Sequence, residues 1–304
     1  MKAGYVEMIV AIADAGSLRA AADRIGKTQP AITKALRNAE EELGDRIFTR
    51  APRGVEPTEI GRAVIARARV IQAELRKLDE EVSQIQGARS GSLHVTVSPL
   101  AAVRIVPKVM DRFRRLFPGV HVQIAGGHPP STTATLRSGD TDIVIGPVPD
   151  ENERSGLSVR PLLSSPISVI TGKGSRYAGA THLAALRDAE WIMIGPRKRI
   201  FGIRRDFLRL GLEPPVPVTT SDSITSLLAM IEGSHRVCSF PTLLLEEIEP
   251  RWQIVRLPLQ DDVTPVEIGL MVRADRPLTP AGRAFVDAVA AQAEKMVASP
   301  TDNQ

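Results

Sequence analysis

The chain has 304 residues, 43% of them hydrophobic and 24% charged, with a formal net charge of +4. This length allows two or three domains with cores of their own, and no apolar run approaches the roughly 20 residues that span a membrane. The single cysteine, Cys238, excludes an internal disulfide framework, and the N-terminus lacks a signal-peptide layout because its apolar stretch carries Glu7 and Asp14. We therefore expect a globular, cytoplasmic protein without a membrane segment.

Two short helices joined by a three-residue turn are expected near the N-terminus. The first covers 17–25 with Ser17 as its N-cap, and the second covers 29–43 with Thr28 as its N-cap. Pro30 falls in the first turn of the second helix, where its missing N–H costs nothing. The inward-facing positions of the second helix are expected to be Ile32, Leu36, Ala39 and Leu43.

This arrangement is typical of a helix-turn-helix, whose second helix enters the major groove of DNA. Amide, hydroxyl and cationic side chains remain on its outer face, and a basic segment suited to a hairpin wing along phosphates follows it. The residues predicted to bind DNA are Gln29, Pro30, Thr33, Lys34, Arg37, Arg50 and Arg53. The alternative is an ordinary helical hairpin with a solvated polar face. Residues 19–69 hold eleven Lys or Arg and seven Asp or Glu, an excess that equals the net charge of the whole chain.

Residues 16–61, GSLRAAADRIGKTQPAITKALRNAEEELGDRIFTRAPRGVEPTEIG, resemble the DNA-binding domain of the LysR-type transcriptional regulators. The family pattern includes GS, AA, (S/T)QPA, LE, LG and a final Gly at the same spacings, which is far more specific than a bare helix-turn-helix. The sequence departs from the pattern at Ile25, Leu36, Ala39 and Pro57. Of these, only Ala39 removes appreciable core volume, because Leu is usual there.

The resemblance implies a multidomain chain of mixed α+β and α/β class. It would have an N-terminal winged helix-turn-helix, a long linker helix that mediates dimerisation, and a C-terminal two-lobed α/β effector domain like that of periplasmic binding proteins. The expected limits are 1–58 for the DNA-binding domain, 59–90 for the linker and hinge, and 91–304 for the effector domain, with lobe I at 92–163 plus 266–297 and lobe II at 164–265.

The linker is predicted from its own sequence as well. After Thr58, a plausible N-cap, the chain has helical character to Gln86, and apolar residues recur at alternating spacings of four and three. These positions are Val64, Ala68, Ile71, Leu75, Leu78, Val82 and Ile85. Such a heptad seam indicates a two-helix coiled coil, which would set the separation of two helix-turn-helix units on DNA. The alternative is an amphipathic helix packed on its own domain.

Strands and helices alternate after residue 91, which predicts parallel sheets covered by helices. Strands are expected at 93–97, 121–125, 142–145, 167–171, 191–194, 216–219, 237–240 and 266–272. Helices are expected at 101–117, 131–138, 182–186, 202–210, 221–231, 241–248 and 280–297. The chain is expected to cross between lobes near 163–166 and 262–266.

A ligand cleft is expected between the lobes, because ligands bind at the carboxyl ends of parallel strands. From the strand ends and the resemblance, the expected effector-binding residues are Ser98, Pro99, Leu100, Gly126, His128, Gly146, Arg197 and Ser221. The basic run at 197–199 favours an anionic effector, since guanidinium groups bind carboxylates bidentately. The alternative for this run is a solvated basic loop.

The expected partners are promoter DNA, a small organic anion, and further copies of the chain in a homodimer or homotetramer, with RNA polymerase as another candidate. No cofactor, metal or membrane is expected. We expect no enzyme either, because the five histidines lack metal-ligand spacing and the sequence has no G-x-S-x-G, P-loop or G-x-G-x-x-G motif. The rival interpretation is a solute-binding protein whose N-terminal helices serve assembly.

Overall fold

The computed structural model describes residues 3–51, 54–129, 131–195 and 202–298. The chain forms two compact units. The first comprises Met1–Gln86 with Ser138–Asp140, and the second comprises Gly87–Arg137 with Thr141–Gln304. None of the described helices is both long and apolar enough to cross a membrane.

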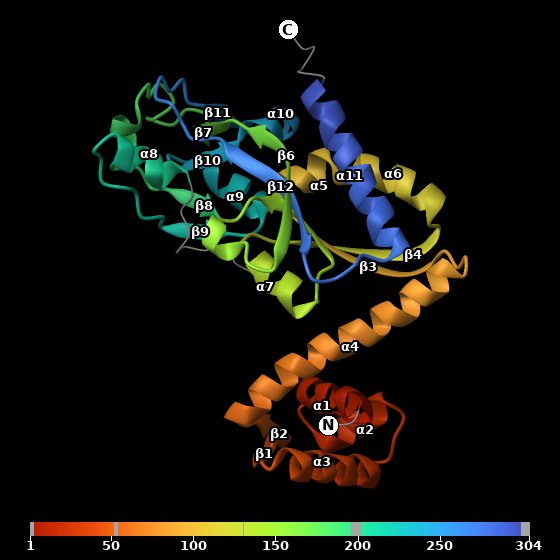
Figure 1. The fold of residues 1–304 in the computed structure, drawn as a ribbon. Coiled ribbons are helices and arrows are strands. Elements are labelled where there is room, and N and C mark those ends of the chain that lie inside the picture. Colours follow the sequence, from red (N-terminus) through yellow and green to blue (C-terminus); the bar gives the residue numbers. More distant parts are fainter. Residues whose placement is uncertain (1–2, 52–53, 130, 196–201, 299–304) are drawn as a thin grey trace. The chain divides into compact units, whose positions relative to one another are not determined.

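The first unit begins with three helices, followed by a hairpin and a long helix (Figure 1). Its elements are α1 (Ala3–Ala15), α2 (Leu18–Arg24), α3 (Gln29–Leu43), β1 (Phe48–Ala51), β2 (Gly54–Pro57) and α4 (Glu59–Ile85). The predicted caps are confirmed: Ser17 Oγ accepts the N–H of Ala20 at 3.2 Å, and Thr28 Oγ1 accepts that of Ala31 at 3.4 Å. The helix-turn-helix prediction is therefore correct in both its helices and its turn.

The core of this unit forms where α2, α3 and the start of α4 pack on α1. Ile32, Leu36 and Ala39 on α3 are buried there, as predicted. Leu43 is 40% exposed, so its predicted inward position is wrong. It lies in the last turn of α3, directly before the left-handed Gly44 that ends the helix.

The hairpin of β1 and β2 is antiparallel, and Arg50 pairs with Val55 across it. Its second strand is fixed to the turn before α2, because the Val55 N–H donates to the Gly16 carbonyl at 2.9 Å. Gly54 permits this approach: a Cβ there would lie 2.1 Å from the same carbonyl oxygen.

The helix α4 begins as predicted, with Thr58 Oγ1 accepting the Gly61 N–H at 2.8 Å. Its predicted seam is divided, however. Ala68 is buried in the core of its own unit beside Ile65. The alternative, a helix packed on its own domain, is therefore correct for this end of α4. The later seam positions are all exposed, by 42% to 69%: Ile71, Leu75, Leu78, Val82 and Ile85.

The second unit contains a five-stranded sheet of order β4-β3-β5-β12-β6. Its strands are β3 (Ser90–Val97), β4 (Gly119–Gly126), β5 (Ile143–Pro147), β6 (Leu157–Ser165) and β12 (Val266–Arg273). The first three are mutually parallel, but β12 is antiparallel to both of its neighbours. The prediction of a parallel sheet is therefore correct for β3, β4 and β5 and wrong for β12, which enters from the other sheet through a loop and not through a crossover helix.

Helices α5 (Pro99–Arg104), α6 (Val106–Leu116), α7 (Ser131–Ser138) and α11 (Pro280–Ala298) accompany this sheet. The helices α6 and α11 lie side by side (Figure 1), and the rings of Phe113 and Phe285 meet edge to face at 5.3 Å. The single helix predicted over 101–117 is wrong. The chain breaks at Ile105 because Pro107 cannot donate a helical hydrogen bond and can only occupy a first turn.

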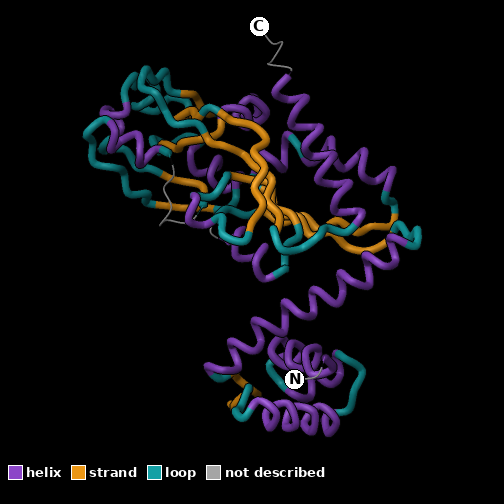
Figure 2. The backbone as a smooth tube through the Cα atoms, viewed as in Figure 1, coloured by secondary structure: helices purple, strands orange, loops and turns teal. Residues whose placement is uncertain are grey.

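A three-stranded antiparallel sheet of order β10-β7-β11 and a parallel pair of β8 and β9 form the rest of this unit (Figure 2). The strands are β7 (Ile167–Gly172), β8 (Ile192–Ile194), β9 (Thr219–Ser221), β10 (Val237–Pro241) and β11 (Ile254–Arg256). The α-helices are α8 (Ile203–Arg209), α9 (Ile224–Ile231) and α10 (Thr242–Ile248), and the 3-10 helices of the unit are η1 (Glu151–Glu153), η2 (Leu183–Leu186) and η3 (Glu249–Arg251). The chain passes between the two sheets at Pro166 and returns before Val266.

Two predictions near β9 are wrong. The strand expected at 216–219 begins only at Thr219, because Pro217 has no N–H for a ladder. The helix cap is Ser223 and not Ser221, since Ser223 Oγ accepts the Ser226 N–H at 3.2 Å.

The sequence pattern also misses β6 and β11. Pro161 obscures β6, and the structure accommodates it beside a β-bulge where β12 changes register between Ile268 and Gly269.

Candidate functional site

The outer face of α3 carries the polar side chains that the sequence assigns to DNA. Gln29, Pro30, Thr33, Lys34 and Arg37 are all exposed. The Thr33 hydroxyl donates to the Gln29 carbonyl at 2.9 Å, which leaves its lone pairs free to accept. Thr28 caps the N-terminus of α3, and these five side chains follow within its first turns on one exposed face.

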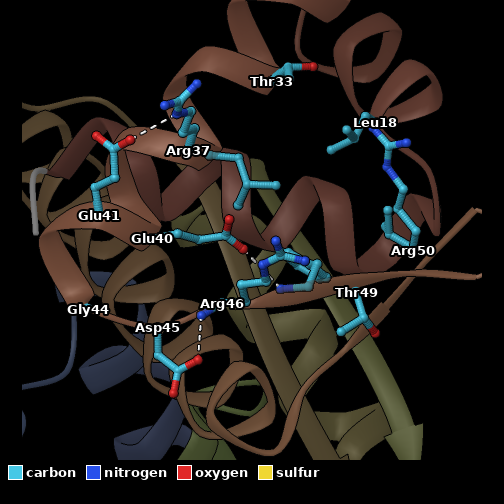
Figure 3. Close-up of a pocket in the computed structure, with 13 residues that line it drawn as sticks. Leu18, Thr33, Arg37, Glu40, Glu41, Gly44, Asp45, Arg46, Thr49 and Arg50 are labelled. Atoms are coloured by element: carbon cyan, nitrogen blue, oxygen red, sulfur yellow. Dashed lines mark hydrogen bonds and ion pairs between the residues drawn. The ribbon is translucent and has the colours of Figure 1, made fainter.

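The hairpin adds a cation beside this row. Arg50 lies exposed on β1 and lines the same hollow as Thr33 and Arg37 (Figure 3). The hollow has a volume of about 1040 Å³ between α3 and the hairpin. The predicted contact Arg53 lies outside the described residues.

Acidic side chains share the hollow with these arginines (Figure 3). Arg37 Nε lies 2.8 Å from Glu41 Oε1, one helical turn away, but both side chains are largely exposed, so the pair is weak and screened. Glu40 instead faces the backbone: its Oε1 accepts the N–H groups of Ile47 at 2.8 Å and Phe48 at 3.2 Å. Sequence reasoning did not single out Glu40, although it is the Glu of the LE pair in the family pattern.

The second unit holds a cavity of about 370 Å³ where the two sheets meet. It is lined by the start of α5, the ends of β5 and β8, the start of α8 and the segment that leads into β12. Four predicted effector residues line it: Ser98, Pro99, Leu100 and His128.

The other described effector residues do not line this cavity. Gly126 and Gly146 are absent from the cavity wall, and Arg197 lies outside the described residues. Gly146 backs Ser98, since a Cβ at 146 would lie 3.3 Å from the Ser98 Cβ. Ser221 lines a neighbouring cavity of about 480 Å³ that shares His128 with the first.

Ser98 is 3% exposed and joins β3 to α5. Its N–H donates to the Ile145 carbonyl at 2.8 Å, which ties it to β5. Its hydroxyl is only 3.5 Å from the Ala101 N–H, at the limit of a hydrogen bond. The Ser98 hydroxyl therefore lies at the cavity wall, and its hydrogen bond with the Ala101 N–H is weak.

His128 stands between the two cavities and packs against Gly195, whose Cβ position would be 3.6 Å from the His128 Cβ. Burial lowers the pKa of His128, and the carboxylate of Asp222 opposes this by favouring the charged form. Among the described residues its Nε2 is buried without a hydrogen-bond partner. The imidazole therefore has one buried ring nitrogen without a partner, in surroundings that favour its uncharged form.

Charged side chains at the 370 Å³ cavity include Arg205 on α8 and Arg154 after β5, which the sequence analysis missed, together with Asp150 and Glu267. Arg154 Nε donates to the Pro149 carbonyl at 2.9 Å. Within the described part of the chain, no hydrogen bond or ion pair of the Arg205 guanidinium is found. The paired arginines of the IRRDF segment were the signal available in the sequence.

A buried carboxylate holds the wall formed by α8. Asp206 is fully buried, and it accepts the N–H of Thr264 at 3.0 Å and the Thr264 hydroxyl at 2.5 Å. Arg209 lies 3.4 Å from the same carboxylate. Because Thr264 also lines the cavity, Asp206 fixes α8 to the segment that returns to β12.

Among the described residues, no cluster of three His, Cys, Asp or Glu side chains could hold a metal ion. Burial raises the pKa of the Cys238 thiol far above neutrality, so it is an un-ionised core residue.

A winged helix-turn-helix attached to a two-sheet α/β domain with an internal cavity defines the class of ligand-responsive DNA-binding regulators. Residues 5–62 match the family described as "Bacterial regulatory helix-turn-helix protein, lysR family", and residues 86–294 match "LysR substrate binding domain". The chain belongs to the LysR family of bacterial transcriptional regulators.

Similar proteins align with nearly the whole chain. The HTH-type transcriptional regulator GbpR of Azospirillum brasilense is 28% identical over 97% of this chain and 87% of its own length. The HTH-type transcriptional regulator GalR of Pseudomonas putida is 29% identical, over 94% and 72% respectively. The structure of full-length CbnR complexed with its target DNA shares the fold, with a TM-score of 0.69 at 21% identity, covering 96% of this chain and 100% of CbnR.

The rival interpretation, a solute-binding protein with assembly helices, is not favoured, because the N-terminal part matches a DNA-binding family. The chain is a DNA-binding transcriptional regulator that responds to a ligand.

Proposed function

We propose that α3 enters the major groove of promoter DNA and that the hairpin follows the adjacent phosphates. The observation that carries this assignment is the exposed polar row on α3 with Arg50 beside it. Gln29 and Thr33 are suited to base edges. The proposed phosphate contacts are Lys34, Arg37, Arg50 and Arg53, with Pro30 at the point where the helix meets the DNA.

We propose that a second copy of the chain covers the exposed apolar stripe of α4. Five large side chains recur on one face from Ile71 to Ile85, and water contact with such a face is unfavourable. A homodimer is the expected unit, with a homotetramer as the further expected assembly. The domain limits 1–58, 59–90 and 91–304 are part of this proposal.

We propose that the effector is a small organic anion bound in the 370 Å³ cavity. That volume lies near the lower end of ligand sites, about 300–1,000 Å³. Ser98 would donate to the acid group and Arg205 would pair with it, while Leu100 and Ile203 contact the apolar remainder. The exposed Glu267 at the same cavity would disfavour a second acid group placed near it.

A thermal-shift screen of small carboxylic acids tests this effector class, with the uncharged amide of each acid as its control. A ligand that binds only the folded state stabilises it, by about 2.7 kcal/mol at 100 times its Kd. We expect at least one acid, and not its amide, to raise the Tm of the full-length protein.

Variants locate the site. Ser98→Ala and Arg205→Gln should reduce the shift, whereas Arg204→Gln, on the same helix but outside the cavity wall, should not. If an amide or amine raises the Tm as much as the acid, the effector is not recognised as an anion. If all three variants respond equally, the site lies elsewhere.

RNA polymerase remains a candidate partner, since a transcriptional regulator acts at promoters. Both promoter DNA and the polymerase lie in the bacterial cytoplasm, where we expect the protein to work.

A further inference from the structure

Among the described residues, each strand of the hairpin of β1 and β2 is attached to the rest of the first unit. The attachment at β2 is the Val55 N–H donated to the Gly16 carbonyl. The one at β1 is the carboxylate of Glu40, which accepts the consecutive N–H groups of Ile47 and Phe48. Glu40 therefore connects the last turns of α3 directly to the strand that carries Arg50.

The burial of the two amides makes this contact costly to lose. Ile47 is completely buried and Phe48 is 6% exposed, so water cannot readily replace the carboxylate. A buried N–H without a partner loses its hydrogen bond to water with nothing in return. Without Glu40, the start of β1 would have to move until both N–H groups found water or another acceptor.

The same peptide is held from the opposite side by the beginning of α4. Thr58 N–H donates to the Ile47 carbonyl at 3.0 Å, and Thr58 Oγ1 donates to the Arg46 carbonyl at 2.7 Å. Gly61 allows the approach, because a Cβ there would lie 1.9 Å from the Ile47 oxygen. Residues 46–48 are thus a shared anchor of the recognition helix, the hairpin and the linker helix.

We propose that Glu40 is a positioning residue for DNA binding: it sets the hairpin, and with it Arg50, at a fixed place beside α3. The proposal rests on the proposed DNA face, in which Arg50 contacts phosphate. Glu40 itself does not touch DNA, because its carboxylate is directed at the backbone of β1.

If Glu40 acts through its charge, its removal should change DNA affinity in one direction, and if it acts by positioning the hairpin, in the other. Removing a carboxylate near DNA should strengthen binding to phosphates, since less repulsion remains. Removing a positioning contact should weaken it. Glu41 is the matched control, because it lies next to Glu40 on α3 and lines the same hollow, but its carboxylate pairs with Arg37 and not with β1.

The test uses the full-length protein and a duplex selected by it from a random DNA pool, with affinity measured by fluorescence anisotropy at several salt concentrations. Glu41→Met should bind as tightly as wild type or more tightly. Glu40→Met should bind at least about tenfold more weakly, with a salt dependence shallower by about 0.9, the value of one lost phosphate contact. Glu40→Gln, which retains an acceptor oxygen, should recover most of the affinity.

Arg50→Ala separates this proposal from the one on which it rests. In the wild-type background it should weaken binding, and in the Glu40→Met background it should add little, because Arg50 is already misplaced. If Arg50→Ala has no effect in wild type, the proposed DNA face is wrong. If it costs the same in both backgrounds, or if Glu40→Met binds more tightly, Glu40 does not position the hairpin.

Should Glu40→Met fail to fold, Glu40→Asp answers the question while keeping the charge. Its side chain is one methylene shorter and cannot reach both N–H groups, so DNA affinity should fall as for Met. Unchanged affinity and salt dependence in Glu40→Asp would overturn the proposal.

Discussion

At the scale of single residues, His128 lines the proposed effector cavity, and its titration affects folding stability. Burial lowers its pKa in the folded chain below the ordinary 6.5, with Asp222 opposing the shift. As the pH falls below 6.5, the unfolded chain therefore takes up a proton more readily than the folded chain. Folding stability should be lost in that range and should be fully present above it.

His128→Gln should reduce this pH dependence, because glutamine does not titrate. Urea unfolding of both proteins at several pH values between 5 and 8 measures the effect. We expect the wild type to lose more stability than the variant on going from neutral to acid pH. Equal losses of stability in the two proteins would show that burial does not lower the pKa of His128.

Local signals explain which residues could be predicted. Ser17, Thr28 and Thr58 each cap a helix a few positions along the chain, so the sequence alone predicts them. Glu40 and Arg205 could not be found in this way. The roles proposed for them depend on contacts with a hairpin and a cavity that form only when distant segments meet.

At the scale of elements, the helix α4 has two different halves. Ile65 and Ala68 pack in the core of the first unit, whereas the stripe from Ile71 to Ile85 is exposed. Periodicity in the sequence is the same in both halves, so it could not reveal where the helix leaves its own domain. Only the packing against α1 distinguishes them.

The exposed half carries the proposed dimer contact. Leu75→Asp with Leu78→Asp should give monomers in light scattering, because a charge buried in the paired stripe would have no partner. Arg76→Asp adds a carboxylate to the same helix on the face away from the stripe and should leave the assembly intact. A soluble dimer from the leucine variant would place the contact elsewhere.

The sheets show the limit of prediction at this scale. Strand positions in β3, β4 and β5 follow from alternating strands and helices, and the sequence predicts them well. The direction of β12 does not follow, because it is set by a return from the other sheet. The bulge that admits Pro161 to β6 likewise depends on β12.

At the scale of the whole molecule, the family defines a regulator in which ligand and DNA bind to different units of the chain. A ligand can change DNA binding only if it prefers one arrangement of the lobes or subunits. Asp206 and its contacts with Thr264 link the cavity wall to the strand that returns between lobes.

Sequence-specific DNA binding through α3 can be measured on the full-length protein. Full-length wild type and Gln29→Ala are titrated by fluorescence anisotropy against a selected duplex, its single-base variants and a shuffled duplex. We expect wild type to prefer the selected duplex, and Gln29→Ala to lose about 1–3 kcal/mol of discrimination at one base position. Equal affinity of the wild type for selected and shuffled DNA, or an unchanged base preference in Gln29→Ala, would contradict the account.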